Sequence, residues 1–171
     1  GGNLNLNNAT LSLLSDLQWS SDSLLDISFL ALNDKALILS DQFSDLKLAN
    51  PLSLDHPNEK LISGEADMEL SALVTIGDGE LSSSGGEVIF EQGIHLDGGK
   101  LEILNSILKV GVQFNKTAGK ALLNGTTLEL PSDLSITSDS LLSIGSLELN
   151  ESSLTLESDD TDLAIEQLLL L

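Results

Sequence analysis

The sequence predicts an all-β fold, a three-sided parallel β-helix (β-solenoid) of about eight coils with roughly 20 residues in each. Short apolar-x-apolar triplets recur at a nearly constant period, fall into three columns, and are separated by residues that form tight turns. In each triplet the two apolar side chains lie on one face of a strand and the middle residue on the other. We therefore expect residues 1–171 to form a single β-solenoid domain, a segment of a longer chain.

The first column of triplets is the most regular of the three. The first residues of consecutive triplets are 19 to 22 residues apart, and a fixed period in this range indicates stacked repeats. We expect the outer residues of each triplet to face the core and the middle residue to face the solvent. The triplets are Leu4-Asn5-Leu6, Leu25-Asp26-Ile27, Leu46-Lys47-Leu48, Met68-Glu69-Leu70, Val88-Ile89-Phe90, Leu108-Lys109-Val110, Leu128-Glu129-Leu130 and Leu147-Glu148-Leu149.

Two further columns complete the three sides. The second is interrupted at Thr75 and Lys116, and it comprises Leu11-Ser12-Leu13, Leu30-Ala31-Leu32, Leu52-Ser53-Leu54, Leu73-Val74-Thr75, Ile94-His95-Leu96, Phe114-Asn115-Lys116, Leu134-Ser135-Ile136 and Leu154-Thr155-Leu156. The third often ends in a polar residue, which indicates a curved or less deeply buried side, and it comprises Leu17-Gln18-Trp19, Leu37-Ile38-Leu39, Leu61-Ile62-Ser63, Leu81-Ser82-Ser83, Leu101-Glu102-Ile103, Leu122-Leu123-Asn124, Leu141-Leu142-Ser143 and Leu163-Ala164-Ile165. Trp19, Phe90 and Phe114 take inward positions in this arrangement, so we expect all three in the core.

The residues between the triplets suit the corners of a coil. We expect the glycine turns to supply positive φ angles, and these turns are Gly77-Asp78-Gly79, Gly85-Gly86, Gly98-Gly99, Asn124-Gly125 and Gly145. Pro51, Pro57 and Pro131 lie at or beside corners, where a missing N–H is least harmful. The longest insertion, residues 55–60, predicts a protruding loop. Because parallel crossovers favour one hand, we expect a right-handed coil.

Two other folds compete with this interpretation. A leucine-rich chain can mimic an amphipathic helix, but 14 Gly, many Ser, Thr and Asn, and the lack of a long three-four apolar spacing disfavour helices. A β-sandwich of short strands is the more serious rival, because it also has regularly spaced turns. Its strands would be longer and richer in β-branched and aromatic residues than these leucine triplets, so the solenoid is favoured.

The composition restricts the partners and surroundings of the chain. Its formal net charge is −20, from 27 Asp plus Glu against 7 Lys, so we expect no nucleic-acid partner and a preference for cations or basic partners. The chain contains no Cys, which fits an exported bacterial protein. It has no apolar run of about 18 residues and no signal-peptide features at its first residues, so no membrane insertion is predicted.

The segments Gly98-Gly99-Lys100-Leu101-Glu102-Ile103 and Gly125-Thr126-Thr127-Leu128-Glu129-Leu130 each join a glycine corner to a triplet. With the period, the absence of Cys and the acidic surface rich in Ser, Thr and Asn, this pattern resembles the parallel β-helix repeats of bacterial surface adhesins. The likeness is to autotransporter passengers and filamentous haemagglutinin-like proteins, and it covers nearly the whole chain. It implies the β-helix fold and an exported, surface-associated role, and it assigns no binding residue.

Charged residues form two predicted ladders on the outside of the coils. In-register stacking of the first column places Lys47 between Asp26 and Glu69, and Lys109 beside Glu129. The residues before the third-column triplets give the second ladder, which comprises Lys60, Glu80 and Lys100. Exposed pairs of this kind contribute about 0–1 kcal/mol each, so we interpret the ladders mainly as support for the register.

Three carboxylates precede first-column triplets in successive coils, namely Asp45, Asp67 and Glu87. Like charges at strand spacing repel, so either solvent screens them or a hard cation such as Ca²⁺ lies between them. Ordinary solvated corners are the simpler alternative. We state Ca²⁺ binding at this acidic corner as a hypothesis, and no other cofactor is predicted.

No catalytic residues are predicted. Enzymes that cleave acidic polysaccharides on β-helices need a base, cationic groups and aromatic platforms, whereas this chain has no Arg, no Tyr and only two His. His95 is the middle residue of its triplet and is expected to face outward, and His56 lies in the long loop beside Asp55. No nucleophile motif, phosphate loop or metal-ligand spacing accompanies them.

These features predict a structural or adhesive segment of an extracellular or cell-surface protein, from a bacterium. It would be a stiff acidic rod that presents loops and faces to a protein or glycan of a host or neighbouring cell. The alternative is a carbohydrate-active enzyme or carbohydrate-binding module on the same scaffold, with His56, His95 and the acidic corner as its candidate residues. The apolar strand at residues 168–171 would leave an open strand edge, which invites pairing, so we expect either that the native chain continues or that copies associate end to end.

Overall fold

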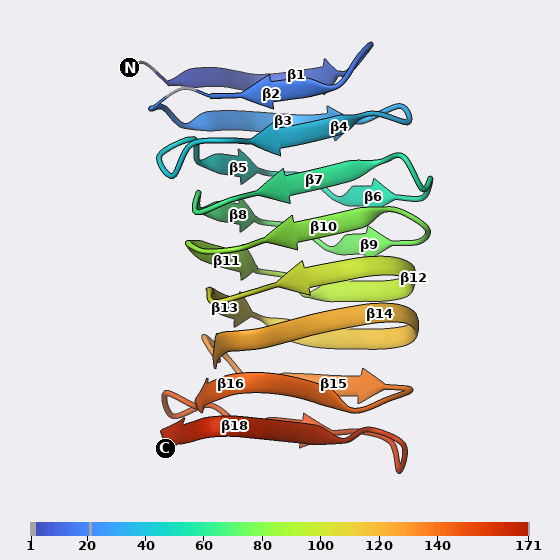
Figure 1. Cartoon of the computed structure of the whole chain (residues 1–171), viewed down its shortest axis with the longest axis vertical. Coiled ribbons are helices and arrows are strands. Elements are labelled where there is room, and N and C mark those ends of the chain that lie inside the picture. The colour runs from blue at the N-terminus through green and yellow to red at the C-terminus, as the bar shows by residue number, and fades with distance from the viewer. Residues whose placement is uncertain (1–2, 21, 171) are drawn as a thin grey trace.

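The computed structural model describes residues 3–20 and 22–170, and within them the chain forms strands and turns without a helix. The strands stack as coils along one axis, from the N-terminus at the top of Figure 1 to the C-terminus at the bottom. All the strand pairs are parallel. The predicted all-β parallel solenoid of about eight turns is therefore confirmed.

The strands are β1 (Leu4–Ser12), β2 (Leu17–Trp19), β3 (Leu25–Ala31), β4 (Ala36–Leu39), β5 (Leu46–Leu48), β6 (Leu52–Leu54), β7 (Lys60–Ser63), β8 (Met68–Leu70), β9 (Val74–Ile76), β10 (Glu80–Ser83), β11 (Glu87–Phe90), β12 (Ile94–Ile103), β13 (Ile107–Val110), β14 (Val112–Glu129), β15 (Leu134–Ser138), β16 (Leu142–Glu148), β17 (Leu154–Leu156) and β18 (Leu163–Leu170). The longer strands, such as β12 and β14, continue around a corner of the coil. In the part of the chain that the structure describes, no helix is long and apolar enough to cross a membrane.

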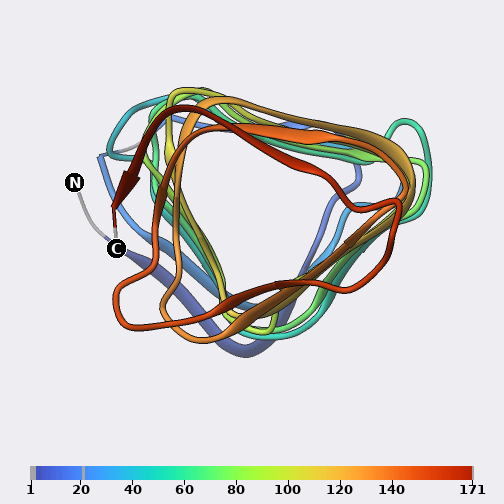
Figure 2. The same ribbon diagram turned by 90° about the horizontal axis from the view of Figure 1, so that it is seen from below.

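The coil is triangular in cross-section and winds to the right. Viewed from the C-terminal end, the superimposed coils trace three sides that meet at three corners (Figure 2). In that view the chain turns counter-clockwise as it advances towards the viewer, from the side of β5 and β8 to that of β6 and β9, and then to that of β7 and β10. We call these the first, second and third sides. Their winding agrees with the hand expected for parallel crossovers.

The first side has the predicted register throughout. Each triplet of the first column lies opposite the equivalent triplet of the next coil, from Leu4 opposite Leu25 to Leu128 opposite Leu147. The ladder then continues to Leu169, which lies opposite Leu147. The inward residues are buried and the middle residues are half-buried from β5 to β13, as the alternation requires.

The second side differs from the prediction at the triplet of β9. Val74, not Leu73, lies opposite Ile94 in the next coil. This register buries Ile76 and turns Thr75 outward, so the interruption expected at Thr75 is wrong. An adjacent pair of apolar residues fits two registers one residue apart, and the one that buries the apolar residue at both ends of the triplet prevails.

The interruption expected at Lys116 is real. Phe114 is buried, as predicted, but it lies opposite Ile136 because its strand begins further upstream at Val112. Lys116 follows on the same inward face, and its side chain is only 4% exposed. Its ammonium group binds the carboxylate of Asp139 in the next coil, so the buried charge is paired.

The third side differs from the prediction in two coils. Ala121 rather than Leu122 lies opposite Leu101, and Leu142 rather than Leu141 begins the next triplet. Each shift of one residue turns an apolar side chain inward, Leu123 in one coil and Leu142 in the next, which the predicted register had placed outside. Leu141 is left 60% exposed at the corner. The cause is again an apolar pair that fits two registers.

The third side is also buried more deeply than expected. From β4 to β16 its last triplet positions are buried, and they are Leu39, Ser63, Ser83, Ile103, Leu123 and Ile144. The two serines satisfy their hydroxyl groups at the corner, since Ser63 Oγ donates to Ala66 O at 2.8 Å and Ser83 Oγ to Gly85 O at 2.7 Å. The polar residues therefore replace apolar ones without opening the core.

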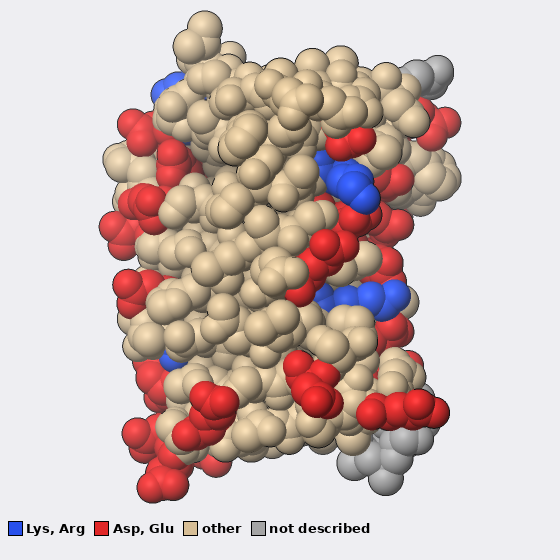
Figure 3. Space-filling view, turned by 180° about the vertical axis from the view of Figure 1, so that it is seen from behind, with Lys and Arg blue, Asp and Glu red and all other residues tan. Residues whose placement is uncertain are grey.

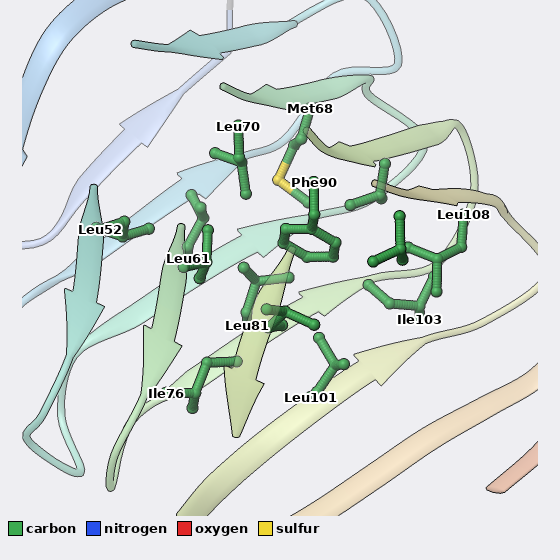
Figure 4. Packing of buried hydrophobic residues seen from close by; sticks show 14 of the residues in the cluster. Leu52, Leu61, Met68, Leu70, Ile76, Leu81, Phe90, Leu101, Ile103 and Leu108 are labelled. Carbon is green, nitrogen blue, oxygen red and sulfur yellow. The ribbon is translucent and has the colours of Figure 1, made fainter. Parts of the chain in front are cut away.

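A single apolar core fills the interior of the coil. Figure 4 shows aliphatic side chains from all three sides packed around Phe90, which is completely buried as predicted. Trp19 is only partly buried, but it packs against this core, and its Nε1 donates to Ser23 O at 3.3 Å. Each fully buried leucine or isoleucine stabilises the fold by about 1.5–3 kcal/mol, so the core is the main source of stability.

The predicted protruding loop connects β6 to β7 and is confirmed. Residues 55–58 are exposed, and their loop projects beyond the common outline of the coils at the right of Figure 2. Glu59 closes the loop, because its Oε2 accepts hydrogen bonds from the N–H groups of Asp55 at 2.9 Å and His56 at 3.2 Å.

Candidate functional site

The corner between the third and first sides is built from small residues. The residue two positions before each first-side triplet is small, and the set is Ser23, Ser44, Ala66, Gly86, Ser106, Thr126 and Gly145. Thr126 Oγ1 donates to Ile103 O of the preceding coil at 2.7 Å. Gly86 has a φ angle of +70°, and a Cβ there would lie 2.6 Å from Glu65 O. The coils therefore approach too closely at this corner for larger side chains.

This tight corner leaves a depression on the outside, which we call the corner groove. It consists of two adjoining hollows of about 590 and 510 Å³ that share Gly86 and Asn105. In Figure 3 the right-hand edge of the molecule, which is the left edge of Figure 1, is hollowed at mid-height. The side chains along the groove include Phe43, Glu65, Asp67, Glu87, Asn105 and Ile107.

Phe43 is a candidate functional residue that the sequence prediction missed. It lies on the loop between β4 and β5, and it is 55% exposed. Asp41 shapes this loop, because its Oδ1 accepts a hydrogen bond from the Phe43 N–H at 3.2 Å. An aromatic residue at a corner, outside every triplet, is the signal that could have identified it, since the core has no place for such a ring.

The structure brings Asp45, Asp67 and Glu87 together on successive coils of this corner, as predicted. The Asp67 N–H donates to Asp45 Oδ1 at 3.1 Å, and the Glu87 N–H donates to Asp67 Oδ1 at 2.7 Å. Glu87 also binds the ammonium group of Lys109. These bonds offset part of the repulsion between the carboxylates. Within residues 3–20 and 22–170 no three acidic or histidine side chains form a group that could hold a metal ion, and Ca²⁺ binding here stays a prediction.

The first charge ladder forms largely as predicted. Lys47 Nζ lies 2.5 Å from Glu69 Oε1, and Lys109 Nζ lies 3.4 Å from Glu129 Oε2. Asp26 lies opposite Lys47 in the register but makes no ion pair with it. The hydrogen bond to Glu69 raises the pKa of Lys47 above its ordinary value. Figure 3 shows the basic groups of this face set among acidic ones.

The second charge ladder also forms. Glu80 lies between two lysines, with Oε2 3.0 Å from Lys60 Nζ and Oε1 3.0 Å from Lys100 Nζ. Burial alone would raise the pKa of Glu80, but the hydrogen bonds from Lys100 and Lys60 outweigh it and lower that pKa below its ordinary value. The ladder therefore ties three successive coils together through one partly buried carboxylate.

The candidate catalytic residues lie apart from one another. His95 faces outward on the second side, where its neighbours in the register are Thr75 and Asn115. His56 lies in the β6–β7 loop, with Nδ1 3.3 Å from Asp34 Oδ1. The acidic corner stands at the junction of the third and first sides, so the fold does not assemble these groups into one site.

A smaller hollow of about 260 Å³ lies on the second side over β14 and β15. Val112 at this hollow has a φ angle of +66°, which is unusual for a β-branched residue. Asn115 Oδ1 and Ser135 Oγ, which also belong to residues of this hollow, are buried without a hydrogen-bond partner. This is a locally strained part of the second side, next to the register change at Phe114.

No protein-family model matches the chain, and no curated protein or solved structure shows significant similarity to it. The chemistry of the surface is therefore the guide to function. The corner groove combines an exposed ring, amide groups and carboxylates in an open depression. Such a surface offers both polar and apolar contacts to a ligand, and neither of the two histidines lines it.

Proposed function

We propose that the chain is a structural or adhesive segment of an extracellular, bacterial cell-surface protein. The solenoid serves as a stiff acidic rod that presents its loops and faces to a protein or glycan of a host or neighbouring cell. The observation that supports this is the first-side register, which runs from Leu4 to Leu169 around one continuous core. Stacked repeats of this kind hold their outer surfaces at a fixed spacing.

Three sequence features support the same proposal. The net charge of −20 keeps such a rod soluble and separate from anionic surfaces. The absence of Cys fits an exported bacterial protein. The repeats also resemble those of autotransporter passengers and filamentous haemagglutinin-like adhesins, whose role is attachment at the cell surface.

An attachment assay tests the proposal. Beads that carry the chain should adhere to arrays of cell-surface proteins or glycans, and soluble chain should compete for that adhesion. We expect no release of reducing or unsaturated sugar ends from polysaccharides incubated with the chain. Turnover of a polysaccharide would contradict the proposal, as would beads that adhere no better than beads carrying denatured chain.

A carbohydrate-binding module is the second candidate, and one observation favours it. Phe43 exposes its ring beside Asn105 and Glu65, and sugar rings are commonly bound by an apolar platform flanked by amide and carboxylate groups. In this case Phe43→Ala should abolish binding to a specific neutral glycan on the array. Release of new sugar ends would extend the assignment to a carbohydrate-active enzyme.

We also propose that copies of the chain associate end to end. β1 pairs with β3 through one of its two edges, and an unpaired strand edge invites another strand. Sedimentation velocity over a wide range of concentrations should show species that grow with concentration. A strict monomer at every concentration would exclude this association.

A further inference from the structure

We propose that the corner groove binds an extended, lysine- or arginine-rich segment of a partner protein. The inference rests on the proposed adhesive function and deepens it, because it names the class of partner and the surface that contacts it. Three properties of the groove support the inference, namely its charge, its exposed apolar side chains and its length along the rod.

The charge of the groove selects a cationic occupant. Its lining contains Glu65, Asp67 and Glu87 and no lysine. Glu87 is partly neutralised by Lys109, but among the described residues neither Glu65 nor Asp67 has an ion-pair partner. Two unpaired carboxylates in a concave surface attract positive charge and repel anions.

The apolar side chains of the groove add a second contact. Phe43 is 55% exposed in one hollow and Ile107 is 40% exposed in the other. An ammonium or guanidinium group binds favourably over the face of an aromatic ring, and the methylene groups of lysine and arginine pack on apolar surface. Phe43 and Glu65 line the same hollow, so one cationic side chain can contact both.

The length of the groove matches a short extended peptide. From the turn of Phe43 to the turn of Gly125 the corner passes through four coil-to-coil steps, which at about 4.8 Å per step gives about 19 Å. An extended peptide rises about 3.3 Å per residue, so about six residues span the groove. Alternate side chains of such a peptide would face the carboxylates.

Fluorescence anisotropy with three labelled probes tests the inference on the folded chain. The probes are an eight-residue Lys-Ser repeat, a Glu-Ser repeat of equal length, and a neutral glucose hexamer. We expect the Lys-Ser peptide to bind, the Glu-Ser peptide not to bind, and the Kd for the Lys-Ser peptide to rise as salt is added, because the attraction is screened. Binding of the glucose hexamer, insensitive to salt and lost in Phe43→Ala, would overturn the inference in favour of a glycan.

Matched variants separate groove binding from general attraction to an acidic protein. Phe43→Ala should weaken peptide binding by about tenfold, and Glu65→Gln by a few-fold. Phe29→Ala removes another exposed ring, 46% exposed and between the first and second sides, and Glu157→Gln removes an exposed charge elsewhere. Both controls should leave the Kd within about twofold.

Equal binding by all four variants would overturn the inference, because the peptide would then bind the rod by diffuse charge. Failure of the Lys-Ser peptide to bind at low salt would also overturn it. Neither result decides the adhesive function, because adhesion through another loop or face does not need this groove. The bead assay tests that function separately. Melting curves of each variant confirm that it is folded.

Discussion

Lys116 places a charged group among the apolar side chains of the second side. Its ammonium group is held by Asp139 and by Ser140 Oγ at 3.0 Å. Because only the lysine of this pair is buried, the desolvation of its ammonium opposes the attraction and the net stability gained is small, but loss of the exposed counter-ion Asp139 is costly. The hydrogen bond from Lys116 lowers the pKa of Asp139 below its ordinary value, so the pair persists until the solution is distinctly acidic.

Two substitutions should separate these effects. We expect Lys116→Met to fold and to melt at least as high as the parent, because an apolar side chain of similar length suits the inward position. Asp139→Asn should melt lower, because it leaves the Lys116 ammonium buried without its counter-ion. Thermal unfolding followed by circular dichroism measures both changes. A Lys116→Met chain less stable than Asp139→Asn would contradict this account.

At the scale of the element, the turns of the third-to-first corner and the strand ladders determine how the coils join. Much of this was predictable: the eight first-side triplets gave the register from Leu4 to Leu147, whereas the further row at Leu169 was not assigned to that column. The pattern failed where two apolar residues are adjacent, as at Leu141-Leu142, because either can begin a triplet. It also gave no sign of the column of small residues, since Ser, Ala and Gly are common in all turns.

Gly86→Ala tests the close approach of coils at this corner. The substitution adds a Cβ 2.6 Å from Glu65 O at a residue with positive φ, so we expect a loss of more than about 1 kcal/mol in the free energy of unfolding. Gly64→Ala is the control, because nothing lies within 4 Å of the added Cβ. Urea denaturation should show that this control changes stability by less than about 0.5 kcal/mol.

Glu80→Gln tests the second charge ladder through its dependence on pH. The pKa of Glu80 is lowered in the folded chain from its ordinary value of 4.5. Its ionised form therefore stabilises the fold above about pH 4.5, and this contribution is lost as the pH falls through the lowered pKa. We expect Glu80→Gln to be less stable than the parent at neutral pH by up to about 1 kcal/mol, and the difference to disappear in strong acid. A difference that is constant with pH would show that the ladder does not act through charge.

At the scale of the whole molecule, contacts between coils are local along the rod. β8, for example, pairs only with β5 before it and β11 after it on the first side. The free energy of unfolding is therefore approximately the sum of the stabilities of the single coils and of the interactions between neighbouring coils, as in other repeat proteins. Phe43 could have been identified as a ring outside the triplets, but the groove was not predictable, because its two hollows form only where the turns of successive coils are stacked.

Pulling the chain from its two ends should therefore open it coil by coil. Each coil contains about 20 residues, so each step should release about 70 Å of extended chain. An optical trap at slow pulling speed would resolve these steps. Rupture of the entire rod in one event would contradict the local character of the contacts.

Because the register is constant from coil to coil, whole coils can be removed or added without a change in the pairing of the others. Residues 88–107 make up one complete coil, and their removal would join Glu87 to Leu108, the residue that already begins the next first-side triplet. Inward and outward residues would keep their alternation along the strand, and Met68 would lie opposite Leu108 in the new register. Deletion or duplication of whole coils thus changes the reach of the molecule while its cross-section stays the same, so length is a property that can vary in evolution independently of the fold.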